Sequence, residues 1–168
     1  MKNEILVTAD GILQWNAATY RCALGRGGIS REKKEGDGTT PAGIFTIRKI
    51  FYRADRIDKP KSVFETIPLS KQDGWCDDVK QAEYNRHITL PHLGRYETLW
   101  RDDDIYNILV VLGYNDDPPV VGKGSAIFMH IARANYMPTD GCIALAYVDL
   151  LQVLATCTTD TVIHSIFL

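Results

Sequence analysis

The stretch GSAIFMHIARANYMPTDGCIAL, residues 124–145, contains the most informative pattern in the chain. Its first apolar run predicts a β-strand over residues 125–131 with His130 near the end, and a tight Thr-Asp-Gly-Cys turn then presents Cys142. A thiol with a pKa of about 8.5 is only a few per cent ionised at neutral pH, and a neighbouring imidazole commonly raises that fraction. We therefore predict that His130 and Cys142 form a base and nucleophile pair.

The predicted pair places further requirements on the turn. Glycine at position 141 allows a backbone conformation or a close approach that a side chain would forbid. The N–H groups of Cys142 and of a neighbour in the turn could face a developing oxyanion. His130 needs a partner on its second ring nitrogen to fix one tautomer, and either a side chain or a carbonyl could supply it. The other cysteines, Cys22, Cys76 and Cys157, are interpreted as small buried hydrophobes.

Short apolar or alternating runs dominate the rest of the chain. They predict strands at residues 5–9, 11–15, 19–24 and 43–51, a buried strand at 105–114 and a closing strand at 162–168. Helical periodicity is scarce, and the best helix candidate is 149–157, where Leu150, Val153 and Leu154 share a face. The sequence thus predicts one mainly β domain over residues 1–168, sandwich-like or barrel-like, with one or two short helices.

Two long connections interrupt this pattern. Residues 25–43 contain six glycines and the charge run Arg31-Glu-Lys-Lys-Glu, which predicts a mobile loop. Residues 55–106 are rich in turn residues and aromatic side chains and are too long for a bare connection, and loops of that size usually carry function. Within them, Trp75 and Trp100 line a groove or pack in a core.

Composition narrows the function classes. With 19 basic and 21 acidic residues and a net charge of -2, the chain lacks the basic field that nucleic acids or anionic membranes require. No run approaches the ~20 apolar residues of a membrane span. The first apolar run, residues 5–7, is too short for a secretory signal. We expect a cytoplasmic protein, with the periplasm as the alternative if a leader has been removed.

The sequence predicts neither a metal ion nor another cofactor. The four cysteines are scattered without a C-x-x-C pair, and a reducing compartment favours free thiols over disulfides. The run Asp102-Asp-Asp is interpreted as a solvated turn, because three adjacent carboxylates cannot all face one cation.

Three elements, in this order, carry a resemblance to a known family. They are Thr40-Pro-Ala-Gly-Ile-Phe45, His130, and the Thr139-x-Gly-Cys-Ile143 turn, and together they resemble the YkuD-like L,D-transpeptidase catalytic domain family over roughly residues 36–150. The resemblance implies a β-rich fold whose cysteine attacks the bond between the L-centre of meso-diaminopimelate and a terminal D-alanine of a peptidoglycan stem. It assigns Cys142 as nucleophile, His130 as base and later acid, Gly141 to the turn that exposes the thiol, and Thr139 to the family's usual serine position.

The chain departs from the family pattern at three positions. Ala144 stands where many relatives carry arginine or asparagine, and Ile131 and Asp140 stand where many carry a glycine and a second histidine. The substrate contacts are therefore open. Candidates for substrate binding are Arg133, Arg86, Arg101, Tyr84 and Trp100, with a carboxylate clamp sought among the arginines.

The resemblance leaves two catalytic outcomes. Water as acceptor gives an L,D-carboxypeptidase that trims tetrapeptide stems, whereas an amine gives a crosslinking or exchanging L,D-transpeptidase. Because a cytoplasmic enzyme meets soluble muropeptides rather than polymerised wall, we predict the carboxypeptidase of peptidoglycan recycling, with a muropeptide or stem tetrapeptide as partner and the transpeptidase as the alternative. A catalytically silent binding module is a third possibility, and the intact His130 and Cys142 count against it.

Overall fold

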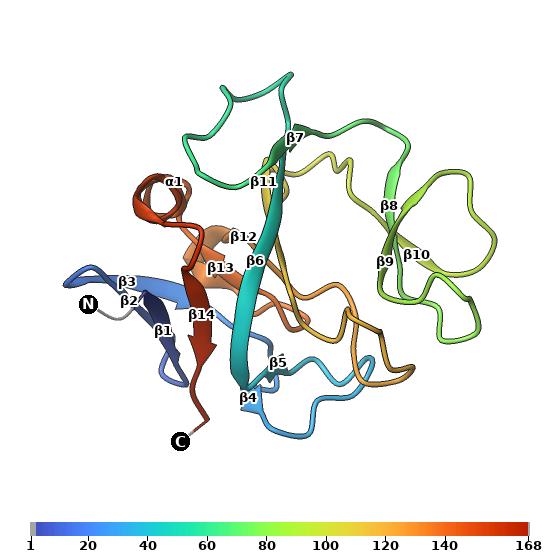
Figure 1. Cartoon of the computed structure of the whole chain (residues 1–168), viewed down its shortest axis with the longest axis horizontal. Helices are drawn as coiled ribbons and strands as arrows, with labels where there is room; N and C mark the ends of the chain where they lie inside the picture. Colours follow the sequence, from blue (N-terminus) through green and yellow to red (C-terminus); the bar gives the residue numbers. More distant parts are fainter. Residues whose placement is uncertain (1–2, 168) are drawn as a thin grey trace.

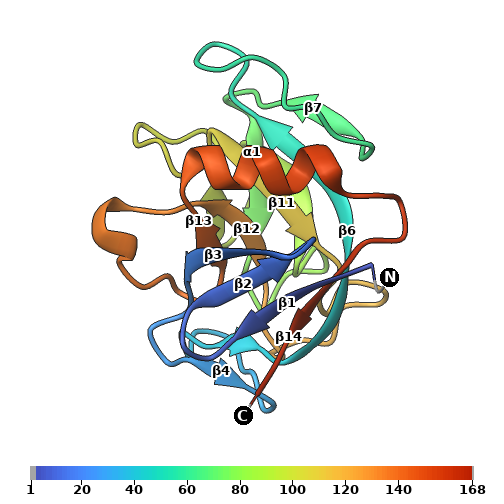
Figure 2. The ribbon, with the colours of Figure 1, turned by 90° about the vertical axis from the view of Figure 1, so that its left-hand side faces the viewer.

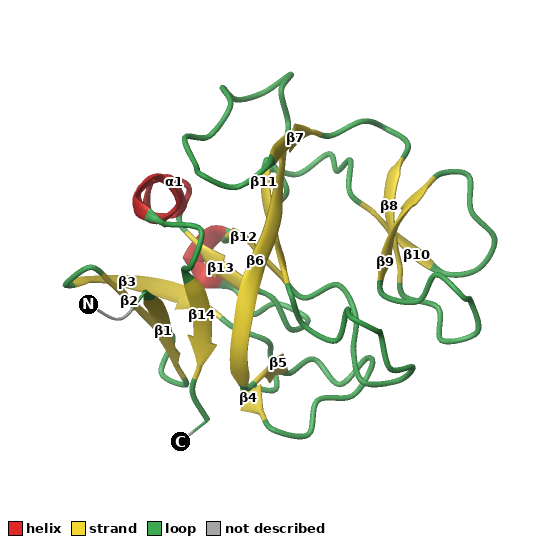
Figure 3. Cartoon of the chain, viewed as in Figure 1, coloured by secondary structure: helices red, strands yellow, loops and turns green. Residues whose placement is uncertain are grey.

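The computed structural model describes residues 3–167, and the chain folds around a closed ring of β-strands (Figures 1 and 3). A nine-stranded sheet has the order β11-β12-β13-β3-β2-β1-β14-β6-β7, and β11 also pairs with β6. Because β6 pairs with both β14 and β11, the sheet closes on itself into a barrel. Strand β7 is an additional strand that pairs only with β6. The mainly β, barrel-like fold predicted from the sequence is thereby confirmed.

The bounds of the barrel strands are as follows: β1 (Glu4–Thr8), β2 (Ile12–Trp15), β3 (Ala18–Ala23), β6 (Gly43–Tyr52), β7 (Thr66–Pro68), β11 (Ile108–Leu112), β12 (Phe128–Ile131), β13 (Ile143–Leu145) and β14 (Val162–Ser165). The predicted strands all fall on these elements, with ends that differ by a few residues. The end of the predicted closing strand, Leu168, lies outside the described residues.

The longest strand, β6, closes the ring. Its first residues pair with β14, from Gly43 opposite Ser165 to Thr46 opposite Val162, and its second half, from Ile47 to Tyr52, pairs with β11. Apolar and polar residues alternate in GIFTIRKIFY as far as Ile47, which faces the barrel interior. A register shift in the pairing with β11 follows, so that Ile50 also joins the interior core and Phe51 joins the other side of the sheet.

The barrel interior holds the larger of two hydrophobic cores. Side chains such as Ile5, Leu13, Ile50 and Ile163 fill it. The helix α1 (Tyr147–Thr156) packs against it and contacts β12, as Figure 2 shows. The face of α1 that carries Leu150, Val153 and Leu154 is buried, which confirms the predicted helix.

A second core lies on the outer face of β11 and β12. Strand β11 reads ILVVL because both faces are covered: Ile108, Val110 and Leu112 join the interior core, whereas Leu109 and Val111 join the second one. We call this second cluster the outer core; it contains Phe51, Leu69, Trp75, Leu99, Ile105, Tyr106, Leu109, Val111, Phe128 and Cys142. The predicted nucleophile thus belongs to the outer core and not to the barrel interior.

A small separate sheet covers the outer core. Its order is β10 (Tyr96–Thr98), β8 (Asp73–Cys76) and β9 (Arg86–Thr89), and in Figure 1 it stands to the right of the barrel. Trp75 of β8 packs edge-on against Phe128 of β12, with 5.0 Å between ring centroids. The long connection 55–106 therefore contains an ordered small sheet, which we call the lid, and Trp75 packs in the outer core.

The glycine-rich connection 25–43 also has structure of its own. It contains the short strands β4 (Ile29–Ser30) and β5 (Thr40–Pro41), which pair in parallel. A 3-10 turn, η1 (Ala134–Tyr136), lies in the crossover between β12 and β13.

Two valines on α1 allow a matched test of core packing. Val153 is fully buried and Val148 is 59% exposed. We expect Val153→Ala to lower the free energy of unfolding by roughly 2–3 kcal/mol, because it removes two buried methyl groups and leaves a cavity. Val148→Ala should change it by less than about 0.5 kcal/mol. Urea unfolding of both variants measures the difference, and equal effects would contradict the packing of α1 described here.

Candidate active site

The pairing of β12 with β13 brings the predicted base and nucleophile together. The two strands are parallel, with His130 opposite Ala144. Side chains alternate along a strand, so Cys142, two residues before Ala144, shares a face with His130. Both line one cavity of about 590 Å³ at the edge of the outer core. The structure therefore joins the two residues that the sequence selected.

The thiol of Cys142 is held by the backbone of the segment before β12. Its S–H donates to the carbonyl oxygen of Ala126 at 3.3 Å, and the N–H of Phe128 donates to the sulfur at 3.4 Å. Among residues 3–167 no hydrogen bond joins the thiol to His130. Catalytic contacts of this kind commonly form or tighten only with substrate.

A backbone carbonyl fixes the tautomer of His130. Nδ1 lies 2.8 Å from the carbonyl oxygen of Ile131, and since a carbonyl only accepts, Nδ1 carries the proton. Nε2 is left with a lone pair that can take the thiol proton. The ring of Tyr106 packs edge-on against the imidazole with 5.3 Å between centroids and restrains its rotation. The partner that the sequence left open is thus the carbonyl of the next residue.

Burial keeps both reactive groups neutral at rest. Desolvation raises the pKa of the Cys142 thiol to about 12, and the nearby Glu97 carboxylate adds to that effect. Desolvation lowers the pKa of His130 to about 4, against the hydrogen bond to Ile131, with Arg133 and Arg101 adding to the decrease. The cavity therefore holds a neutral thiol and a neutral imidazole.

The turn before the nucleophile is stabilised by Thr139. Its hydroxyl donates to the carbonyl of Cys142 at 2.7 Å and accepts from the N–H of Gly141 at 3.1 Å. The N–H of Gly141 is thereby occupied, whereas the N–H of Cys142 makes no hydrogen bond within residues 3–167. Of the two predicted oxyanion donors, the N–H of Cys142 is the one that is free.

Gly141 is required by its conformation and by its neighbour. Its φ is +142°, and a Cβ built there would meet the carbonyl oxygen of Thr39 at 2.8 Å. The connection 25–43 thus lies directly against the catalytic turn. Two backbone hydrogen bonds of 2.9 Å hold the turn at the start of this segment. Thr139 N–H donates to the carbonyl of Leu24, the residue before the connection, and Arg26 N–H donates to the carbonyl of Thr139.

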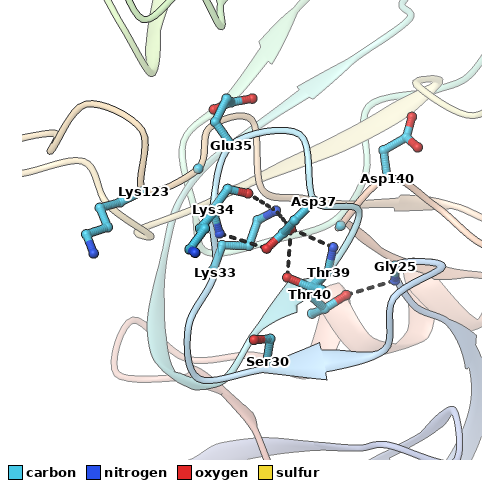
Figure 4. Close-up of polar contacts among 12 residues, drawn as sticks. Gly25, Ser30, Lys33, Lys34, Glu35, Asp37, Thr39, Thr40, Lys123 and Asp140 are labelled. Carbon is cyan, nitrogen blue, oxygen red and sulfur yellow. Dashed lines mark hydrogen bonds and ion pairs between the residues drawn. The ribbon is translucent and has the colours of Figure 1, made fainter.

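Asp37 organises this connection (Figure 4). Its carboxylate accepts from the ammonium group of Lys33 at 2.7 Å, from the N–H of Lys34 at 2.7 Å, and from the N–H and hydroxyl of Thr39 at 2.9 and 2.8 Å. Lys33 is 7% exposed, so Asp37 neutralises a buried charge. The sequence predicts a mobile loop over residues 25–43, and the structure shows that these bonds join residues 33–39 to one another.

The same contacts set the charge state of Asp37. Burial acts to raise the pKa of the carboxyl, but the hydrogen bonds from Lys33, Thr39 and Lys34 outweigh it and hold the pKa well below its usual range. Asp37 therefore carries a full negative charge at neutral pH.

The predicted substrate-binding residues lie in different places. Arg133 and Arg101 line the cavity with Cys142. Arg101 pairs with Asp103 at 2.7 Å. Arg133 forms no ion pair with any of residues 3–167.

Tyr84, Arg86 and Trp100 do not line this cavity. Tyr84 is buried, and its hydroxyl donates to Glu35 at 2.5 Å. Trp100 stacks under the guanidinium of Arg53 at 3.6 Å. Arg86 borders a smaller cavity of about 300 Å³. Of the five predicted substrate-binding residues, two, Arg133 and Arg101, therefore line the same cavity as Cys142.

Two residues that the sequence analysis did not select complete the cavity wall. Glu97 lies on β10 of the lid, and the hydroxyl of Tyr106 donates to its Oε1. Nothing in the local sequence marks either residue, because the lid reaches the site only through pairing of strands distant in sequence.

Asp103 and Asp104 of the triple-aspartate turn are paired with arginines. Asp103 binds Arg101, and Asp104 lies 3.4 Å from Arg56. Within residues 3–167 no group of three histidine, cysteine or acidic side chains is arranged for a metal ion.

The geometry is that of a cysteine enzyme: a thiol and a tautomer-fixed histidine line one cavity on the outer face of a β-barrel, an arrangement suited to acyl transfer. The profile of the L,D-transpeptidase catalytic domain family, YkuD, matches residues 5–164. The chain therefore belongs to the L,D-transpeptidase catalytic domain family, and it is a peptidoglycan-related cysteine enzyme that acts on stem peptides.

No curated protein and no solved structure matches the chain. None of the helices formed by residues 3–167 has the length and apolar character needed to cross a membrane.

The neutral resting pair can be tested by thiol chemistry. With the thiol pKa near 12, alkylation of Cys142 by iodoacetamide should be slow at pH 7 and rise about tenfold per pH unit from pH 7 to 9.5. A thiolate held by an imidazolium would instead give a plateau across neutral pH. Mass spectrometry of the Cys142 peptide follows the rate, and such a plateau would contradict the neutral pair.

A second test concerns Asp37. We expect Asp37→Asn to lower stability at pH 7 by roughly 3 kcal/mol, because the buried Lys33 loses its counter-charge. Since the folded pKa is depressed, this stabilisation is complete above the ordinary carboxyl pKa of about 3.9 and is lost as the pH falls below it.

The advantage of the wild type over Asp37→Asn should therefore be constant from pH 8 to 5 and shrink toward pH 3. Urea unfolding across this range measures it, with Asp58→Asn, at an exposed aspartate, as the control. An advantage that grew on acidification would contradict the assigned role.

Proposed function

We propose that this protein is a cytoplasmic L,D-carboxypeptidase of peptidoglycan recycling, which removes the terminal D-alanine from tetrapeptide stems. The observation that carries the proposal is the cavity of about 590 Å³ that holds both Cys142 and His130. Its volume suits one small ligand, within the range of roughly 300–1,000 Å³ of such sites. A site that fits one stem end favours water as the acceptor over the amine of a second stem.

The reaction follows from the resting geometry. The thiol passes its proton to Nε2 of His130, and the sulfur attacks the carbonyl carbon of the diaminopimelate L-centre. The bond from that carbon to the D-alanine nitrogen breaks, and the leaving amine takes the proton from the imidazolium. A thioester of Cys142 remains. The N–H of Cys142 faces the oxyanion in this step and is worth about 3 kcal/mol as a donor.

Hydrolysis of the thioester uses the same imidazole, which now carries a proton from water to the sulfur. A water molecule gives a proton to Nε2 of His130, and its oxygen attacks the thioester carbonyl. The carbon–sulfur bond breaks, the sulfur takes the proton back, and the tripeptide leaves. Tyr106 and the Ile131 carbonyl keep Nε2 aimed into the cavity during both steps.

Arg133 is our choice for the carboxylate contact. Among the arginines predicted from the sequence, Arg133 and Arg101 border the nucleophile, and Arg101 is already bound to Asp103. The guanidinium of Arg133 is free to bind a carboxylate of the stem.

The cytoplasmic compartment is part of this proposal. Fractionation of the untagged protein tests the assignment: recovery with cytoplasmic markers is expected, and recovery with periplasmic markers would favour the transpeptidase.

The activity is tested with a disaccharide tetrapeptide and mass spectrometry. The wild type should release one D-alanine, Cys142→Ala should release none above background, and His130→Gln should be slowed by about 10²–10⁴-fold. Cys157→Ala, which removes a buried thiol from the interior core, is the matched control and should stay active.

A D-amino acid in excess distinguishes the two outcomes. Tripeptide as the main product supports the carboxypeptidase, whereas a stem carrying the added amino acid supports the transpeptidase. Binding of the stem with neither product would support the silent module instead.

A further inference from the structure

The charges that line the cavity are mostly satisfied inside the protein. The pairs are Arg26 with Asp140, Lys33 with Asp37, Arg95 with Asp77 and Glu35, and Arg101 with Asp103. Within residues 3–167 two lining side chains have no ion-pair partner, Arg133 and Glu97. Arg133 is accounted for by the carboxylate contact proposed above, and Glu97 is left without a partner of opposite charge.

Glu97 is held in place by a neutral donor. The hydroxyl of Tyr106 donates to Oε1, and Oε2 makes no hydrogen bond with any of residues 3–167. The side chain is half-buried and lines the cavity. One oxygen of an anchored carboxylate is therefore available to a ligand.

Glu97 is also close to the chemistry. Tyr106, to which it is bonded, packs against the ring of His130 at 5.3 Å between centroids. The carboxylate stands near enough to Cys142 to raise the pKa of the thiol. A ligand group bound to Oε2 would thus lie close to both Cys142 and His130.

A carboxylate in such a place favours a cationic ligand. Burial raises the pKa of Glu97, against the hydrogen bond from Tyr106 and the charge of Arg101, which means that its ionised form is poorly solvated. A ligand ammonium would restore that solvation through a charge-assisted hydrogen bond. It would also neutralise the charge that disfavours the thiolate of Cys142.

We propose that Glu97 is the cation-binding residue of the active site and receives the side-chain ammonium of the diaminopimelate residue. This inference rests on the proposed stem-peptide substrate. It makes Glu97 the residue that selects a free amine at this position, and it couples binding of that amine to ionisation of the thiol.

Two substrates and three variants test it. The substrates are the tetrapeptide with a free side-chain amine and the same peptide with that amine acetylated. For the wild type we expect kcat/KM to be at least about tenfold higher for the free amine, which corresponds to one charge-assisted contact. Glu97→Gln should bring the ratio close to one. Glu65→Gln, at an exposed glutamate outside the cavity, should keep the wild-type ratio.

The alkylation rate gives a readout that does not depend on turnover. At pH 8 the Cys142 thiol should react several-fold faster in Glu97→Gln than in the wild type, because removal of the charge lowers the thiol pKa. Glu97→Asp retains the charge and should keep slow alkylation and part of the amine preference, which also covers a failure of the glutamine variant to fold.

The outcomes separate this inference from the proposed function. Release of D-alanine from both peptides at equal rates, or a preference that survives in Glu97→Gln, overturns the role of Glu97 while the carboxypeptidase stands. Release from neither peptide overturns the carboxypeptidase and, with it, the inference.

Discussion

The parallel pairing of β12 with β13 is the constraint on which the site depends. Parallel neighbours cannot be joined by a tight hairpin, so the chain must leave the sheet between them and return. The return passes through η1 and the turn at residues 139–142, and it delivers Cys142 to the same face as His130. Every other feature of the site either holds that turn or shapes the space in front of it.

The outer face of the barrel then determines the chemistry. Because β11 is covered on both faces, the reactive pair sits beside packed apolar side chains and not in water. Burial disfavours the charged forms of both groups, so the site rests as thiol and imidazole. A nucleophile kept in this way is protected from adventitious alkylation and oxidation, since the thiolate is the reactive species.

The sequence was sufficient where the signal was local. Alternation located β6, helical spacing located α1, and a turn glycine beside a cysteine located the nucleophile. It was insufficient where the answer depended on pairing between distant segments. Closure of the barrel through β6, the lid sheet and the position of Glu97 all require register information that no single stretch contains.

The connection 25–43 has more internal structure than its composition indicates. Its six glycines indicate freedom in the unfolded chain, but the carboxylate of Asp37 offers four acceptor contacts within a few residues. Aspartate is well suited to bond the backbone nearby in this way. Composition alone could not show that Lys33 is buried beneath it and makes the arrangement costly to open.

Residues 35–37 contact two parts of the structure around the cavity. Glu35 receives the hydroxyl of Tyr84 from the lid, and Asp37, two residues later, anchors the segment on which the nucleophile turn rests. The lid and the segment below the sulfur are therefore linked through residues 35–37. A substitution that removes the hydrogen bond between Tyr84 and Glu35 is expected to affect both.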